Sequence, residues 1–184
     1  KLQGSKYLPS WVGDCYSQVR KHIINGRKVL FVGVPCQVAA LKTFIQHENL
    51  ITVDLVCHGV PSYLPFQDYI HHFFPYQPIT KVNFRNKQNG WLRFNVSIEN
   101  DDQILETKFH LFNPFFAGYL KNIFLKGICY HCPFCTLPRQ GDLTLGDFWG
   151  IPKDKCHHDE GASIVLANNE KGVRLIESLR AHGA

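Results

Sequence analysis

The sequence has 184 residues, of which 45% are hydrophobic and 19% are charged, and its formal net charge is +5. These values are typical of a globular protein. No apolar run reaches the ~18 residues that a membrane-spanning helix needs. The positive charge is dispersed, without the run of Lys and Arg that would indicate a nucleic-acid partner.

The cysteine content indicates a reducing compartment. Seven cysteines cannot all pair with one another, and three of them lie within one short segment. We therefore expect free thiols or metal ligands rather than a disulfide framework, and a cytoplasmic location without a signal peptide. The sequence contains no Met, which predicts that it is a fragment of a longer chain.

Two apolar runs in the first half of the sequence are each followed by a helical pattern. Residues 28–33 and 50–56 are almost wholly apolar, which favours strands that are buried on both faces. Pro35 suits the first turn of the helix after the first strand, and Ser62 is a good N-cap for the helix after the second. This order predicts parallel strands joined by right-handed crossovers, preceded by a short helix over 18–24.

A cysteine follows the end of each of these expected strands, at Cys36 and at Cys57. The carboxyl ends of neighbouring parallel strands lie about 5 Å apart, at the sheet edge where α/β proteins bind ligands. The free N–H groups and the dipole at a helix start also favour a thiolate at Cys36. Both residues are therefore candidate metal ligands, and inert packing is the alternative for each.

The middle of the sequence changes to a period of two. Segments 79–85, 92–98 and 104–110 alternate apolar with polar residues, which predicts an antiparallel meander with one exposed face. The fold class is therefore α/β, a single domain with parallel strands, crossover helices and a β meander. The remaining expected elements are a helix over 113–125, a strand over 142–146, a buried strand over 162–167 and a final helix capped by Asn168 or Asn169.

Cys129, Cys132 and Cys135 have the spacing C-x-x-C-x-x-C, which lets three sulfur atoms face one centre. The spacing favours an iron–sulfur cluster, with a zinc ion or plain reduced thiols as the alternatives. A [4Fe–4S] cluster needs four thiolates. The triplet and the two strand-end cysteines supply five candidates, whereas Cys15 and Cys156 lie in no supporting pattern.

Five motifs are spread along most of the chain, namely Gly4–Tyr7, Val29–Gln37, Val53–Ser62, Cys129–Phe134 and Gly141–Ile151. In this order they resemble the C-terminal region of the beta subunits of coenzyme F-420 hydrogenases and dehydrogenases. The resemblance implies that residues 1–184 form one such domain, without the ferredoxin-like region found upstream in full-length relatives. It also implies an iron–sulfur flavoprotein oxidoreductase with FAD and a [4Fe–4S] cluster. Its redox partner would be a ferredoxin-like domain or protein, or a deazaflavin or nicotinamide donor.

The resemblance also implies a set of site residues. The cysteine motifs of the family match Cys36, Cys57, Cys129 and Cys132, with Cys135 as the substitute. The flavin-binding residues that it implies are Ser5, Lys6, Ser10, Gly33 and Gln37. The phosphates of the flavin would lie near the Gly-Ser-Lys loop and the helix start at Cys36, where backbone N–H groups attract anions.

Two other functions are compatible with the same residues. In one, the cysteine triplet folds a zinc-stabilised binding or assembly module in which no electrons move. In the other, Cys36 is a thiol nucleophile that the helix start and His58 activate. The composition predicts neither a nucleic-acid partner nor a membrane span for any of these functions.

Overall fold

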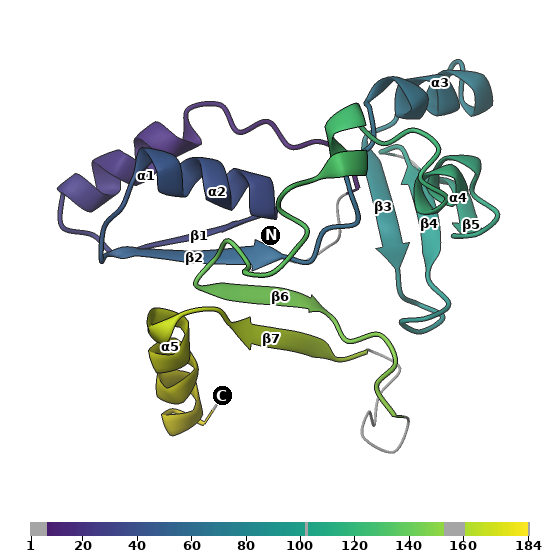
Figure 1. Ribbon diagram of the computed structural model, residues 1–184. Coiled ribbons are helices and arrows are strands. Elements are labelled where there is room, and N and C mark those ends of the chain that lie inside the picture. Colours follow the sequence, from purple (N-terminus) through teal and green to yellow (C-terminus); the bar gives the residue numbers. More distant parts are fainter. Residues whose placement is uncertain (1–6, 102, 153–160, 184) are drawn as a thin grey trace. The chain divides into compact units, whose positions relative to one another are not determined.

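The computed structural model describes residues 7–101, 103–152 and 161–183. Within these residues the strands form two sheets, and the chain divides into two compact units (Figure 1). The first unit comprises Lys1–Ser10, Gly59–His131 and Pro152–Gly161, and the second comprises Trp11–His58, Cys132–Ile151 and Ala162–Ala184. The two units therefore interleave along the sequence. No helix of the described residues has both the length and the apolar character that crossing a bilayer requires.

The sheet of the second unit has the strand order β1-β2-β6-β7 (Figure 1). Strands β1 (Val29–Gly33) and β2 (Leu50–Leu55) are parallel, as are β2 and β6 (Leu143–Asp147). Strand β7 (Ser163–Ala167) runs antiparallel to β6. The predicted parallel pair with its crossover helix is thus confirmed, and an antiparallel strand completes the described sheet.

Helices α1 (Cys15–Ile24) and α2 (Pro35–Phe44) pack against β1 and β2. Helix α2 begins at Pro35, as its sequence predicts, because proline loses no hydrogen bond in a first turn. Helix α5 (Glu170–Ala181) packs against β7. The buried centre of this unit consists of Val19, Ile23, Leu41, Ile45 and Leu50.

Alternate side chains of β1 differ sharply in exposure. Val29 and Phe31 pack against the helices, whereas Leu30 is 62% and Val32 is 51% exposed. Strand β7 is also largely exposed, with Val165 at 45%. The prediction that β1 is buried on both faces is therefore wrong, as is the prediction that β7 is a buried strand. Side chains alternate between the two faces of a sheet, and the helices α1 and α2 cover only one of them.

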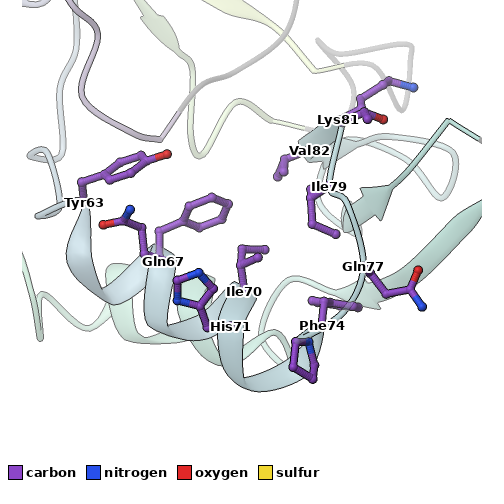
Figure 2. Close-up of a pocket in the computed structure, with 12 residues that line it drawn as sticks. Tyr63, Gln67, Ile70, His71, Phe74, Gln77, Ile79, Lys81 and Val82 are labelled. Carbon is purple, nitrogen blue, oxygen red and sulfur yellow. The ribbon is translucent and has the colours of Figure 1, made fainter.

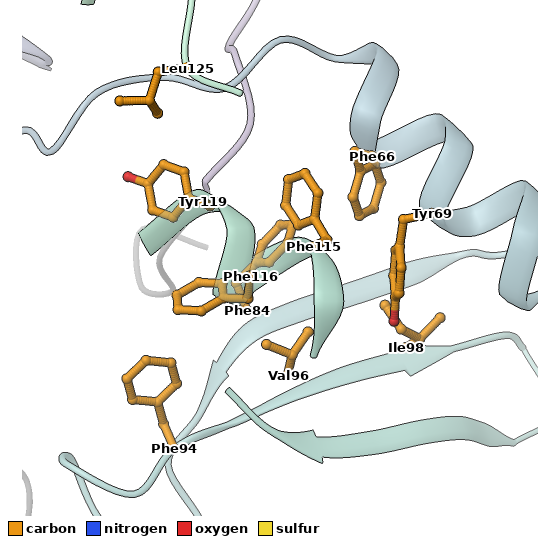
Figure 3. Close-up of a cluster of buried hydrophobic side chains, with 10 residues drawn as sticks. All are labelled: Phe66, Tyr69, Phe84, Phe94, Val96, Ile98, Phe115, Phe116, Tyr119 and Leu125. Atoms are coloured by element: carbon orange, nitrogen blue, oxygen red, sulfur yellow. The ribbon is translucent and has the colours of Figure 1, made fainter. Parts of the chain in front are cut away.

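The sheet of the first unit is the predicted antiparallel meander. Its strands β3 (Lys81–Asn86), β4 (Asn95–Glu99) and β5 (Ile104–Phe109) pair in chain order. Helices α3 (Leu64–Phe73) and α4 (Pro114–Leu120) place aromatic side chains over this sheet (Figure 3). The buried cluster consists of Phe66, Tyr69, Phe84, Phe94, Val96, Ile98, Phe115, Phe116, Tyr119 and Leu125.

Two helices of the first unit have different ends from those expected. Helix α3 begins at Leu64, and Ser62 is not its cap: the backbone N–H of Ser62 instead donates to the carbonyl of Phe124 at 3.0 Å. Helix α4 ends at Leu120 rather than at residue 125. Asn122 has a left-handed backbone with φ of 59°, which interrupts the helical path.

Candidate cysteine site

Cys36 and Cys57 follow the ends of neighbouring parallel strands. Cys36 lies in the first turn of α2, and Cys57 follows the last residue of β2 by two positions. In the register of β1 and β2, Gly33 is opposite Asp54, so both cysteines come after the same edge of the sheet. Neither residue forms a disulfide, and Cys36 is exposed and Cys57 partly exposed. The expected arrangement of strand ends is present, and metal binding by the two residues stays a prediction.

Cys129 belongs to the first unit and lies in a short 3-10 turn, Gly127–His131. Its sulfur accepts a hydrogen bond from the backbone N–H of Val60 at 3.5 Å. A backbone donor therefore already faces the sulfur of Cys129.

Cys132 and Cys135 belong to the second unit, in a segment over 132–141 that contains no helix or strand. Cys132 is partly exposed and Cys135 is exposed. The Cys135 thiol donates a hydrogen bond to the carbonyl of Cys132 at 3.0 Å. This contact directs the sulfur of Cys135 to the backbone of its own turn. The assignment of Cys135 as the spare member of the five stays a prediction.

In the described part of the chain, no three His, Cys, Asp or Glu side chains converge as they would around a bound metal. The chemistry of the residues still fits an iron–sulfur cluster. None of the six described cysteines forms a disulfide, and each is at least partly exposed. Thiolate sulfur is the ligand that such clusters take. In addition, Nε of Arg139 is a buried donor without a hydrogen-bond partner among the described residues, so an added acceptor would satisfy it.

The residues expected to bind flavin belong to different parts of the structure. Ser5 and Lys6 lie outside the described residues, as does Cys156. Ser10 is exposed and belongs to the first unit, whereas Gly33 and Gln37 belong to the second. Their contact with a flavin stays a prediction.

Gly33 and Gln37 interact at the start of α2. The side-chain oxygen of Gln37 accepts a hydrogen bond from the N–H of Val34 at 3.1 Å. A side chain at position 33 would place its Cβ 3.0 Å from that oxygen and 2.9 Å from the ring of Phe31. Glycine therefore permits this close approach, and the amide of Gln37 closes the first turn of the helix.

A buried polar cluster in the second unit was not singled out from the sequence. Thr52, Asp54 and Thr144 are at most 1% exposed and lie on adjacent strands. The carboxylate of Asp142 accepts from both the N–H and the hydroxyl of Thr52, at 2.8 and 2.9 Å. The available signal was the polar residues at alternate positions inside the apolar runs of β2 and β6.

Both carboxylates of this cluster have a lowered pKa. Burial alone would raise the pKa of Asp54, but hydrogen bonds from Thr144, Gly141, Arg139 and Gln140 outweigh it. Burial likewise would raise the pKa of Asp142, but hydrogen bonds from Asn169 and Thr52 lower it further than burial raises it. The two groups are therefore held as carboxylates inside the sheet.

A pocket of about 500 Å³ lies in the first unit between α3 and β3 (Figure 2). Tyr63, Gln67 and His71 line its helical side, and Ile79 and Lys81 line the side of the strand. Among the described residues that form its wall there is no cysteine and no expected flavin contact. The pocket is thus not composed of residues predicted for either cofactor.

Comparison with known proteins gives a family and a fold. A family model that describes the C terminus of the beta subunit of coenzyme F420 hydrogenase/dehydrogenase matches residues 26–184, through both units. No curated protein matches. A solved chain of the xenon-derivatised F420-reducing [NiFe] hydrogenase complex from Methanosarcina barkeri is similar, with a TM-score of 0.58 and 17% sequence identity.

The alignment with that chain covers 98% of this chain and 57% of the other. At this level of identity the likeness shows the fold, and this chain spans little more than half of the length of the other. The family model, in contrast, matches most of the sequence. The chain therefore belongs to the family formed by the C-terminal regions of coenzyme F420 hydrogenase/dehydrogenase beta subunits.

Proposed function

We propose that this chain is the redox module of an iron–sulfur flavoprotein oxidoreductase. Membership of the family indicates a redox-related role. The single observation that carries the finer proposal is the placement of Cys36 and Cys57 after the parallel neighbours β1 and β2. Open α/β sheets bind their ligands at this edge, outside the carboxyl ends of the strands.

In the proposed metal site, Cys36, Cys57, Cys129 and Cys132 are the ligands of a [4Fe–4S] cluster, and Cys135 is a neighbour. The at least partial exposure of all four residues, none of which forms a disulfide, supports this assignment, as does the N–H of Val60 that faces the sulfur of Cys129. When bound, such a cluster supplies one-electron transfer. The share of the four cysteines is to bind it as thiolates, and backbone N–H groups such as that of Val60 would stabilise the negative charge of the bound cluster.

FAD is the second cofactor of the proposal, and when bound it supplies hydride chemistry. The start of α2 offers backbone N–H groups and the positive end of a helix dipole, which suit phosphate oxygens. Gly33 precedes that start and leaves room there for the Gln37 amide. The redox partner of the proposal is a ferredoxin-like domain or protein, or a deazaflavin or nicotinamide donor, in a reducing compartment such as the cytoplasm.

Anaerobic purification of the full-length protein tests this function. Metal analysis should give about four irons per chain for this cluster, in addition to those of any ferredoxin-like region, with broad absorption near ~400 nm, and a bound flavin should add its own structured bands. Stoichiometric zinc without iron would rule the proposal out in favour of a zinc-stabilised binding or assembly module. The full-length protein is used because the solved relative is longer than this chain, which covers 57% of it.

A further inference from the structure

A buried carboxylate lies near the end of the strand that leads to Cys57. Asp54 of β2 is 0% exposed. Its Oδ1 accepts from Nη2 of Arg139 at 2.9 Å and from the hydroxyl of Thr144 at 2.7 Å. Its Oδ2 accepts from the N–H groups of residues 140 and 141, each at 2.8 Å. Three of these donors come from one short segment, which the carboxylate thereby anchors to β2.

Arg139 extends this anchor to the backbone on both sides. Its side chain is 9% exposed. Besides the carboxylate, Nη2 donates to the carbonyl of Leu55 at 3.3 Å, two residues before Cys57. Nη1 donates to the carbonyl of Phe134 at 3.4 Å, two residues after Cys132. One planar guanidinium therefore bridges the strand end before one cysteine and the turn after another, all within the second unit.

Regular secondary structure does not orient this turn, because residues 132–141 contain no helix or strand. A buried ion pair is a weak source of stability, since the cost of removing two charges from water offsets their attraction. A guanidinium instead fixes the orientation of the groups that it binds. Its donors lie in one rigid plane, which the single ammonium group of a lysine does not reproduce. The pair of Asp54 and Arg139 is thus suited to fixing the orientation of the turn.

We propose that Arg139, held by Asp54, is a positioning residue for metal binding. It sets the turn that carries Cys132 against the end of β2, so that the sulfur atoms of Cys132 and Cys57 meet one metal centre. This inference rests on the proposed function, because it takes both cysteines as ligands of the cluster. Residues that orient metal ligands without touching the metal change its affinity by about 10–100-fold.

Two variants and one control separate positioning from charge. Arg139→Lys keeps the buried positive charge but loses the planar set of donors. The double variant Asp54→Asn/Arg139→Gln removes both charges together. Arg174→Gln is the matched control, because Arg174 forms an exposed ion pair with Glu170 in the same unit. In each variant the apo protein is unfolded with urea to show that the fold is retained.

The first measurement uses anaerobically reconstituted full-length protein. Iron retention against a chelator and the reduction potential are compared with those of the wild type. Arg139→Lys should hold iron about 10–100-fold less well, with a urea midpoint of the apo protein close to that of the wild type. The double variant should lose as much iron and have a lower midpoint, because it lacks the Asp54 carboxylate. The Arg174→Gln control should match the wild type in both measurements.

The second measurement needs no iron. Apo protein that keeps only Cys57 and Cys132 among its cysteines is titrated with phenylarsine oxide, which bridges two thiols. Binding should weaken about 10–100-fold after Arg139→Lys. If the wild type holds no iron but this result is obtained, the proposed function fails and the positioning role stands.

Two results would overturn the positioning role. The first is wild-type behaviour of Arg139→Lys with either probe, because charge alone would then be sufficient. The second is unfolding of every Arg139 variant, which would assign the ion pair to folding of the whole unit.

Discussion

At the scale of single residues, the thiol of Cys135 donates a hydrogen bond to the carbonyl of Cys132. We expect Cys135→Ser to keep the cluster, because a serine hydroxyl can donate to the same carbonyl. The corresponding serine variants of the four proposed ligands should each lose it. Iron content and the EPR signal of the reduced protein measure this. Loss of iron in Cys135→Ser together with its retention in Cys57→Ser would reverse the assignment.

Gly141 shows how tightly the polar cluster is packed. A Cβ at this position would lie 2.6 Å from the carbonyl oxygen of Leu143 and 2.7 Å from the nitrogen of Asp54, and both are backbone atoms. We expect Gly141→Ala to lower the free energy of unfolding by about 1–3 kcal/mol, the usual cost of overpacking. Gly127→Ala is the control, since nothing lies within 4 Å of its added carbon. Equal urea midpoints for the two variants would contradict this packing.

At the scale of elements, the residue that caps α5 also binds a buried carboxylate. The side-chain oxygen of Asn169 accepts from the N–H of Gly172 at 2.9 Å, and its amide donates to the carboxylate of Asp142, also at 2.9 Å. Asn and Asp are normally equivalent caps. Here Asn169→Asp should destabilise the protein by about 1–3 kcal/mol, because the buried carboxylate loses a donor.

The free energy of unfolding at neutral pH measures the effect of Asn169→Asp. The control is the same change in an Asp142→Asn background, in which no carboxylate faces position 169. An equal loss of stability from Asn169→Asp in both backgrounds would count against the role of the Asp142 carboxylate.

The elements that local chemistry specifies were predictable from the sequence. The apolar runs, Pro35 and the alternation of the meander led to the correct β1, α2, β2 and β3–β5. Other features depend on contacts that a run of residues does not contain. The exposure of Leu30 and Val32 follows from which face the helices cover, and the bond between Arg139 and Asp54 joins residues 85 positions apart. The cysteine motifs, in contrast, could be recognised from the sequence, because they depend on local spacing along the chain.

At the scale of the whole molecule, the two units should respond differently to acid. Asp54 and Asp142, whose pKa values are lowered from 3.8, both belong to the second unit. A lowered pKa contributes stability that is present above the ordinary value and lost as pH falls through the folded value. Acid below about pH 3.9 should therefore destabilise the second unit first.

Hydrogen exchange of the apo protein at fixed ionic strength measures this difference. As pH falls from 6 to below about 3.9, the amides of β2 and β6 should lose protection before those of β4. The neutral-pH sample is the control, in which both sheets should be protected. Earlier loss of protection in β4 would contradict the assignment of acid sensitivity to the buried carboxylates.

The interleaving of the two units has a consequence for synthesis on the ribosome. Strand β2 ends at Leu55 and its neighbour β6 begins at Leu143, 88 residues later. At about 5–20 residues per second, β2 therefore emerges roughly 4–18 s before β6 is made. During that interval Asp54 has none of its donors from residues 139–144. The sheet of the second unit is thus completed late in translation, and the proposed metal loading, which depends on Arg139, would come later still.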